Sequence, residues 1–333
     1  MSIQPITATG ADPDEPVALE QTDPTTLPKG HPVDAQAGKD GISPRAQLTQ
    51  LLNYFEDNYP EIFRSLTTDE ATTSPDGVTA ELKDRTERMW ARVPDLITHC
   101  SLLVLGAGLD HAMPTAAFLK TGPTAEPTAV AGLPATVLRP SEPTGAVAVS
   151  LHGGPGWFGD AEAHDQLWLP LFAALAERSG VTVVDLVYPL PAFGQDGSAA
   201  SAAGAAATQD AVAAAFREVQ GWAQPGQRTG LITFGSGFGL ATHVLQDAAF
   251  LLAMSPRISP ELVDAPPALA QVPTLVSVAS EDSRGTPAAE VRDFFSACAP
   301  SAEFRAYLSE HIIGAPDVWR RRVSDDAGWL AQR

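Results

Sequence analysis

The sequence predicts an α/β protein built on a doubly wound, mostly parallel sheet. Two observations carry this prediction. Short apolar runs typical of buried strands alternate with amphipathic segments from residue 129 to residue 333. Corners rich in glycine and proline close most of these runs. Strands that alternate with helices pair in parallel through right-handed crossovers, so helices should cover both faces of the sheet.

The totals are those of a globular chain that can bury a large core. It has 333 residues, 44% of them hydrophobic and 18% charged. A net charge of -19 argues against nucleic acid and anionic membranes as partners, because phosphate would be repelled. Cys100 and Cys298 are too few for a disulfide framework. The start of the chain does not resemble a signal peptide, and no apolar run has the length of a membrane span, so we expect a cytoplasmic protein.

The first part of the chain divides into two segments. Residues 1–43 are rich in Pro, Asp, Thr and Gly, which predicts a disordered tail. Residues 44–128 should form a helical extension, which could act as a lid, with helices over 44–63 interrupted at Pro60 and over 78–97 broken at Pro94. The run 102–110 is similar to a nucleotide-binding turn, but the Pro- and Thr-rich connector 121–128 follows it. We therefore interpret that run as a buried apolar segment with a glycine turn and predict no cofactor.

From residue 129 the predicted elements follow the α/β alternation. A turn-rich hairpin connection, 139–145, should join the first two strands. The expected strands are 129–138, 146–151, 181–188, 231–234, 250–254, 272–279 and 303–307. The expected helices are 166–178, 210–222, 287–298 and 316–330, with a further helix after the strand 231–234, and 194–207 is interpreted as a mobile loop or the start of a helix.

One strand ends in a glycine-rich corner that is typical of a nucleophile elbow. Residues 231–234 run into Gly235-Ser236-Gly237-Phe238-Gly239. An elbow reads G-x-S-x-G, because the nucleophile occupies a strained turn that needs small neighbours. Gly235 and Gly239 have the required spacing, but the residue midway between them is Gly237. A serine, Ser236, stands one position early.

Other candidate site residues also follow predicted strands, where ligands bind in such sheets. The run His152-Gly153-Gly154-Pro155-Gly156-Trp157 could turn backbone N–H groups toward a developing oxyanion. Asp282 follows the strand 272–279, and His311 lies between the strand 303–307 and the last helix.

Together these motifs resemble the α/β-hydrolase family, nearest to its hormone-sensitive-lipase-like esterase branch. The resemblance implies an oxyanion loop at residues 152–157, a triad acid at Asp282 with Glu281 as the fallback, and a triad histidine at His311. The elbow of the branch, G-D-S-A-G-G, aligns with residues 235–240 and places the nucleophile at Gly237. Residues 184–193 match the D-Y-R-L-A-P-E segment of the branch in part. The implied oxyanion hole is Gly153, Gly154 and Gly237, and the implied ligand pocket is His152, Trp157, Phe158 and Phe238.

Two functions follow from these residues. In the first, a protein of carboxylic-ester-hydrolase ancestry has glycine in place of its nucleophile, so hydrolysis is weak or absent and the site could bind a small acyl or ester ligand or a protein partner. In the alternative, Ser236 is a displaced nucleophile that acts with His311 and Asp282 in an active serine esterase. The substrate, the oligomeric state and whether the protein is an enzyme stay open. No metal site is predicted, because His99, His111, His164 and His243 lack ligand spacing.

Overall fold

The structure is a computed structural model. It describes residues 7–8, 43–65, 78–105, 123–154, 157–190, 199–222, 227–258 and 269–333. The tail predicted for residues 1–43 therefore lies outside the described residues, apart from positions 7, 8 and 43. The glycine turn predicted after residue 105 and most of the loop 194–207 also lie outside them.

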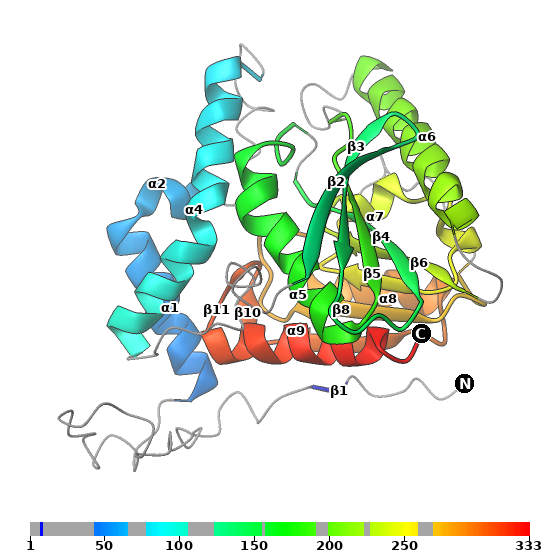
Figure 1. The fold of residues 1–333 in the computed structure, drawn as a ribbon. Helices are drawn as coiled ribbons and strands as arrows, with labels where there is room; N and C mark the ends of the chain where they lie inside the picture. Colours follow the sequence, from blue (N-terminus) through cyan, green and yellow to red (C-terminus); the bar gives the residue numbers. More distant parts are fainter. Residues whose placement is uncertain are drawn as a thin grey trace.

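A twisted nine-stranded sheet organises the described part of the chain (Figure 1). Its strand order is β1-β9-β8-β7-β6-β4-β5-β3-β2. In this spatial order, all neighbouring strands from β1 across to β5 are parallel. At the other edge, β3 pairs antiparallel with β5, and β2 pairs antiparallel with β3. The strands are β1 (Thr7–Ala8), β2 (Thr124–Val130), β3 (Leu133–Arg139), β4 (Val147–Leu151), β5 (Thr182–Leu186), β6 (Thr229–Phe234), β7 (Leu251–Met254), β8 (Thr274–Ala279) and β9 (Glu303–Tyr307). This is the doubly wound, mostly parallel sheet that the sequence predicts.

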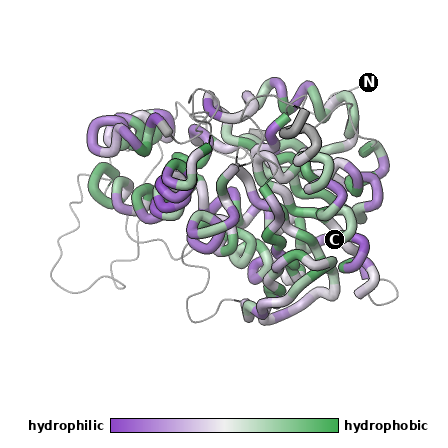
Figure 2. The backbone as a smooth tube through the Cα atoms, turned by 90° about the horizontal axis from the view of Figure 1, so that it is seen from above, coloured by the Kyte–Doolittle hydropathy of each residue, from purple (hydrophilic) through white to green (hydrophobic). Residues whose placement is uncertain are grey.

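Helices cover both faces of the sheet, so there are two hydrophobic cores. One core packs α5 (Leu169–Ser179), α9 (Pro316–Leu330), α1 (Pro44–Asn58) and α4 (Ala80–Leu105). The other packs α6 (Ala199–Trp222), α7 (Gly237–Leu240) and α8 (Ala288–Cys298). Figure 2 shows hydrophobic residues along the central strands and hydrophilic ones recurring along the outer helices. The central strands β4, β6, β7 and β8 are buried almost throughout, as strands covered on both faces must be.

The helical extension packs against the first of these cores. Phe55 of α1 and Trp90 of α4 are both buried in it, and the short helix α2 (Pro60–Ser65) follows α1. Pro60 does interrupt the helices as predicted. The predicted break at Pro94 is wrong, because α4 runs through that residue to Leu105. The start of the run 102–110 is therefore the end of a helix, and the prediction of a buried apolar segment is wrong for Leu102 and Leu103, which are 46% and 56% exposed.

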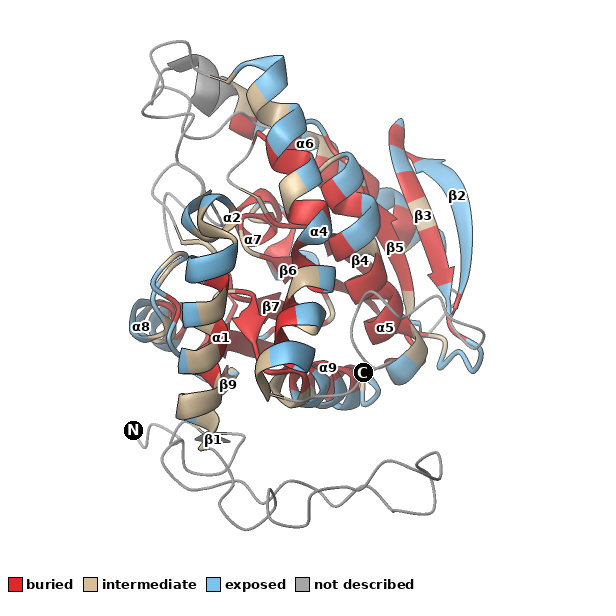
Figure 3. Ribbon diagram, turned by 90° about the vertical axis from the view of Figure 1, so that its left-hand side faces the viewer, coloured by how far each residue is buried: buried red, intermediate tan, exposed pale blue. Residues whose placement is uncertain are grey.

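Two other predicted segments differ in the structure. The stretch 129–138, predicted as one strand, contains the tight turn of a hairpin, with Ala131 and Gly132 both at positive φ. β2 starts at Thr124, inside the predicted connector, and is an exposed edge strand (Figure 3). β3 pairs with β2 and β5 but not with β4, so 139–145 does not join a hairpin. The pattern did not indicate β2 because four of its seven residues, Ala125, Glu126, Pro127 and Ala129, are poor strand formers that an edge tolerates.

The helices near the predicted site also differ from expectation. α6 begins at Ala199, so the low-complexity alanines belong to a long helix, as alanine's high helix propensity allows. The elbow helix α7 has only four residues before the chain turns into the 3₁₀ helix η3 (Leu245–Asp247). Among the described helices, none combines the length and apolar character needed to cross a membrane.

Candidate functional site

The parallel sheet brings the predicted site residues to one edge. β4, β6, β8 and β9 run in the same direction, so the loops after them meet at their carboxyl ends. These loops carry His152 to Gly154, Gly235 to Gly237, Asp282 and, through the hairpin β10–β11 (Ser309–Glu310 and Ile313–Gly314), His311.

The sharp turn after β6 is centred on Gly235. This residue follows the strand directly and has φ +53°, a left-handed conformation that side chains rarely adopt. A Cβ placed on Gly235 would lie 3.4 Å from Cα of Gly153 and 4.0 Å from the backbone nitrogen of Gly154. Any side chain at position 235 would therefore face the glycine loop after β4.

Gly237, the position that sequence alignment gave to the nucleophile, has no room for a side chain. It begins α7, and a Cβ there would lie 2.5 Å from the carbonyl oxygen of Leu151 and 2.7 Å from that of His152. Those distances are too short for any side chain, and both contacts are rigid backbone. Glycine at 237 is needed because the elbow packs against the end of β4.

Ser236 lies between these two glycines in the right-handed helical region, with φ -65° and ψ -20°. It is only 3% exposed. Its hydroxyl forms no hydrogen bond with any residue that the structure describes, His311 included.

Asp282 and His311, which the sequence predicts as a triad acid and a triad histidine, lie within hydrogen-bond distance of each other. His311 Nδ1 and Asp282 Oδ2 are 3.0 Å apart, and His311 has φ +51° in its tight turn. The other carboxylate oxygen, Oδ1, accepts hydrogen bonds from the backbone nitrogens of Arg284 (3.0 Å) and Gly285 (2.7 Å). Burial alone would raise the pKa of Asp282, but the hydrogen bond and charge of His311 outweigh it and lower the pKa. The carboxylate is thus ionised and fixed.

The fallback acid, Glu281, faces away from this pair. Its carboxylate lies 3.4 Å from the guanidinium of Arg45 in an exposed ion pair.

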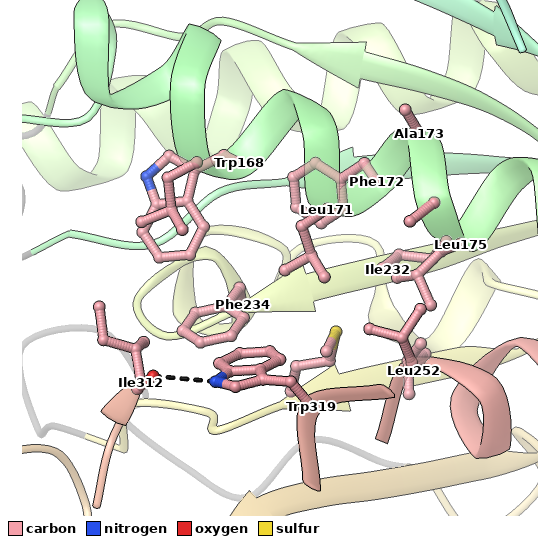
Figure 4. Packing of buried hydrophobic residues seen from close by; sticks show 14 of the residues in the cluster. Trp168, Leu171, Phe172, Ala173, Leu175, Ile232, Phe234, Leu252, Ile312 and Trp319 are labelled. Atoms are coloured by element: carbon pink, nitrogen blue, oxygen red, sulfur yellow. Dashed lines mark hydrogen bonds between the residues drawn. The ribbon is translucent and has the colours of Figure 1, made fainter. Parts of the chain in front are cut away.

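The turn that carries His311 is held by a buried tryptophan. The backbone carbonyl of Ile312, next to His311, accepts a hydrogen bond of 2.9 Å from the indole of Trp319 (Figure 4). Figure 4 also shows Phe234, the last residue of β6, between Trp168 and Trp319, with ring centroids of Phe234 and Trp168 4.7 Å apart.

Backbone donors line the space between the two loops. Within the described residues, the N–H groups of Gly153, Gly154 and Ser236 donate no hydrogen bond. Buried or half-buried N–H groups normally find an acceptor. These three belong to the two facing loops at the position where a Gly235 side chain would point.

A buried polar network lies beneath the glycine loop, and sequence analysis missed its centre. Asp185, in the middle of the apolar strand β5, accepts a hydrogen bond of 2.6 Å from the Ser150 hydroxyl, and its other oxygen is 2.8 Å from His164 Nε2. The Tyr188 hydroxyl donates a 2.7 Å bond to the carbonyl of His152, whose ring stacks on the tyrosine. Asp185 is the residue that could have indicated this network from the sequence, since a carboxylate inside a buried strand requires a partner.

The two histidines of this network carry different charges. Burial, together with the charge of the nearby His164, lowers the pKa of His152 to about 4. Burial also lowers the pKa of His164, but the carboxylates of Asp185 and Asp165 outweigh it and raise the pKa to about 10. His164 is thus a buried cation paired with Asp185, and His152 is a neutral ring.

The helix α4 contributes a second anchor that the sequence did not reveal. The buried carboxylate of Glu87 accepts hydrogen bonds from the backbone nitrogens of Gly159 (2.5 Å), Asp160 (3.2 Å) and Ala163 (3.0 Å). Burial raises the pKa of Glu87. Trp90, one helical turn later, makes an edge contact with His311. The extension therefore contacts both the segment that follows the glycine loop and the turn that carries His311. No local pattern around Glu87 could indicate this.

The four residues predicted to line a pocket are all deeply buried. His152 and Trp157 pack inside the loop, and Phe158 contacts Trp90. Phe238 packs against Phe295 of α8, in the core on the other face of the sheet. Pro155 and Gly156 of the same loop lie outside the described residues. In the described ranges no group of three or more His, Cys, Asp or Glu is placed to hold a metal ion.

Comparison with known proteins identifies the fold. No protein-family model and no curated protein sequence matches this chain. Among solved structures it is similar to a hormone-sensitive lipase from a metagenome library, with a TM-score of 0.55 and 17% identity over 82% of this chain and 98% of that one. An esterase from the bacterial hormone-sensitive lipase family gives 0.53 and 14% over 86% and 97%. A mutant of the esterase E40 gives 0.54 and 15% over 86% and 98%. The chain has the α/β-hydrolase fold.

Proposed function

We propose that this protein descends from carboxylic ester hydrolases, binds a small acyl or ester-type ligand, and has lost the nucleophile of its elbow. The observation that carries the proposal is Gly235. It has the strained backbone of an elbow, it follows the central strand β6 directly, and its absent side chain would face the glycine loop. We therefore assign the nucleophile position to Gly235 in place of Gly237.

The rest of the site supports ligand binding at this position. The N–H groups of Gly153, Gly154 and Ser236 would act as an oxyanion hole and hold the carbonyl oxygen of the ligand. The Asp282–His311 pair would supply a base or a hydrogen bond to the ligand or to a water molecule. Without a hydroxyl or thiol at position 235, no acyl-enzyme forms there.

The alternative is an esterase that uses Ser236 as its nucleophile. The favouring observation is that the Ser236 hydroxyl makes no hydrogen bond to a described residue. Against it, Ser236 is buried, has a relaxed helical backbone, and follows the elbow residue by one position. In hydrolases of this fold the residue after the nucleophile contributes its backbone N–H to the oxyanion hole, which is the role that we assign to Ser236.

Hydrolysis of short-chain p-nitrophenyl esters tests the proposal. The wild-type protein should show only background hydrolysis, and Ser236→Ala should not change it. Gly235→Ser should raise the rate by about a hundredfold or more, because a positioned base and oxyanion donors are already present. Gly235→Ser combined with His311→Asn is the matched control and should return the rate to background.

Two outcomes would contradict the proposal. Wild-type hydrolysis that Ser236→Ala abolishes would establish the displaced nucleophile and an active esterase. A folded Gly235→Ser protein without activity would show that more than the nucleophile is missing. Circular dichroism and the thermal midpoint of each variant establish that it is folded.

A further inference from the structure

A cavity lies outside the site, between helices α2 and α4. Its volume is about 430 Å³, within the range of small-molecule sites. The two helices lie side by side on the outer side of the extension in Figures 1 and 3. The cavity is lined by Glu61, Ile62, Arg64, Arg85, Thr86, Arg88, Met89 and Arg92.

The lining is strongly basic although the whole chain is acidic. Four of the 21 Lys and Arg residues of the protein converge on this cavity, in a chain of net charge -19. Arg85, Arg88 and Arg92 are spaced by three and four residues, which places them along one face of α4, and Arg64 approaches from α2. Like charges at this spacing repel each other, so the arrangement gains from an anion between them.

Only part of this positive charge is neutralised by the described residues. Arg88 forms an ion pair with Asp84, and Glu61 is the one carboxylate among the described residues of the lining. Arg64 and Arg92 form no ion pair with a described residue. Each guanidinium presents a planar fork of donors that suits phosphate and carboxylate oxygens.

We propose that the cavity between α2 and α4 binds a small phosphate-bearing molecule. Guanidinium groups that approach from two helices need an anion with acceptor oxygens in several directions. A tetrahedral phosphate directs its oxygens to several sides, whereas the two oxygens of a carboxylate lie in one plane. The half-buried side chains of Ile62 and Met89 add an apolar wall, which suits a phosphate carried on an organic group.

Titration calorimetry of the full-length protein with pyrophosphate at low ionic strength tests this proposal. The wild-type protein should bind one pyrophosphate per chain, and inorganic phosphate more weakly. Arg64→Gln combined with Arg92→Gln should weaken binding by about a hundredfold, tenfold for each charge-assisted pair lost. Arg217→Gln combined with Arg228→Gln is the matched control, since it removes two exposed arginines elsewhere and should leave the affinity unchanged.

Three results would overturn the proposal. The first is no binding of pyrophosphate by the wild-type protein. The second is equal weakening in the control variant, which would show general attraction and not a site. The third is binding of citrate as tight as that of pyrophosphate, which would contradict the assignment to phosphate. Thermal midpoints of both double variants within a few degrees of wild type show that a lost affinity is not lost folding.

Discussion

The two halves of the candidate site differ in what they retain. On one side, Asp282 and His311 form a fixed pair whose carboxylate has every oxygen satisfied. On the other side, the elbow keeps its backbone turn and its facing glycine loop, but Gly235 offers no side chain. Under our proposal, the comparison teaches that the strained turn of an elbow can persist without its nucleophile, because the turn is held by packing of Gly237 on β4 and not by the residue at its centre.

Gly237→Ser would remove the elbow itself, and we expect the largest effect from it. Its Cβ would meet two backbone carbonyl oxygens at 2.5 and 2.7 Å, so the turn must open, at a cost of about 3 kcal/mol or more. Gly235→Ser meets no contact under 3.4 Å and should cost only about 1–2 kcal/mol for its positive φ. Urea unfolding of both variants measures this difference. Equal costs would contradict the assignment of position 235.

The charge state of the network beneath the glycine loop sharpens the contrast with the Asp282–His311 pair. The pKa of His164 is raised to about 10, so its contribution to stability is fully present below the unfolded value of about 6.5 and is lost as the pH rises toward 10. Between pH 7 and 9 the loss of this contribution should lower the free energy of unfolding by up to about 1.4 kcal/mol per pH unit.

Asp185→Asn is the matched variant for that experiment. It removes the carboxylate that holds the proton on His164, and the slope between pH 7 and 9 should shrink. Nitrogen-15 NMR of the histidine rings gives an independent readout. At pH 7.5 His164 should be protonated and His152, with its pKa of about 4, should be neutral. A neutral His164 at that pH would rule out the buried ion pair.

Glu87→Gln probes the anchor from α4 and should have the smallest effect of the three. The amide can still accept from one or two backbone N–H groups, but its NH₂ would face another donor. The loss should be about 1–2 kcal/mol, partly offset because the neutral amide is cheaper to bury. Glu81→Gln, on the exposed first turn of the same helix, should change stability by less than about 0.5 kcal/mol. Equal effects of the two substitutions would show that the anchor contributes nothing.

Much of the fold could be predicted from local pattern. The apolar strands β4 to β8 and the helices α5, α8 and α9 are predictable because burial on both faces leaves a continuous hydrophobic run and amphipathic helices leave a periodic one. Asp282 and His311 were found because they follow strands of such a sheet, and the structure brings them within 3.0 Å. The edge strand β2 escaped, since an exposed edge has no such pattern.

The sequence by itself determined the class of sheet, the glycine loops and the acid–base pair, because each depends on residues close together in the chain or on strand order. Tertiary structure alone decided that Gly235 takes the left-handed turn after β6 and that Gly237 has no room for a side chain, since φ and the approach of Leu151 are set by packing between β4 and β6. It also decided that Glu87 and Asp185 are anchors of the site. Their partners, Gly159 and His164, are 72 and 21 residues away, and a carboxylate does not reveal from sequence which distant N–H it will meet.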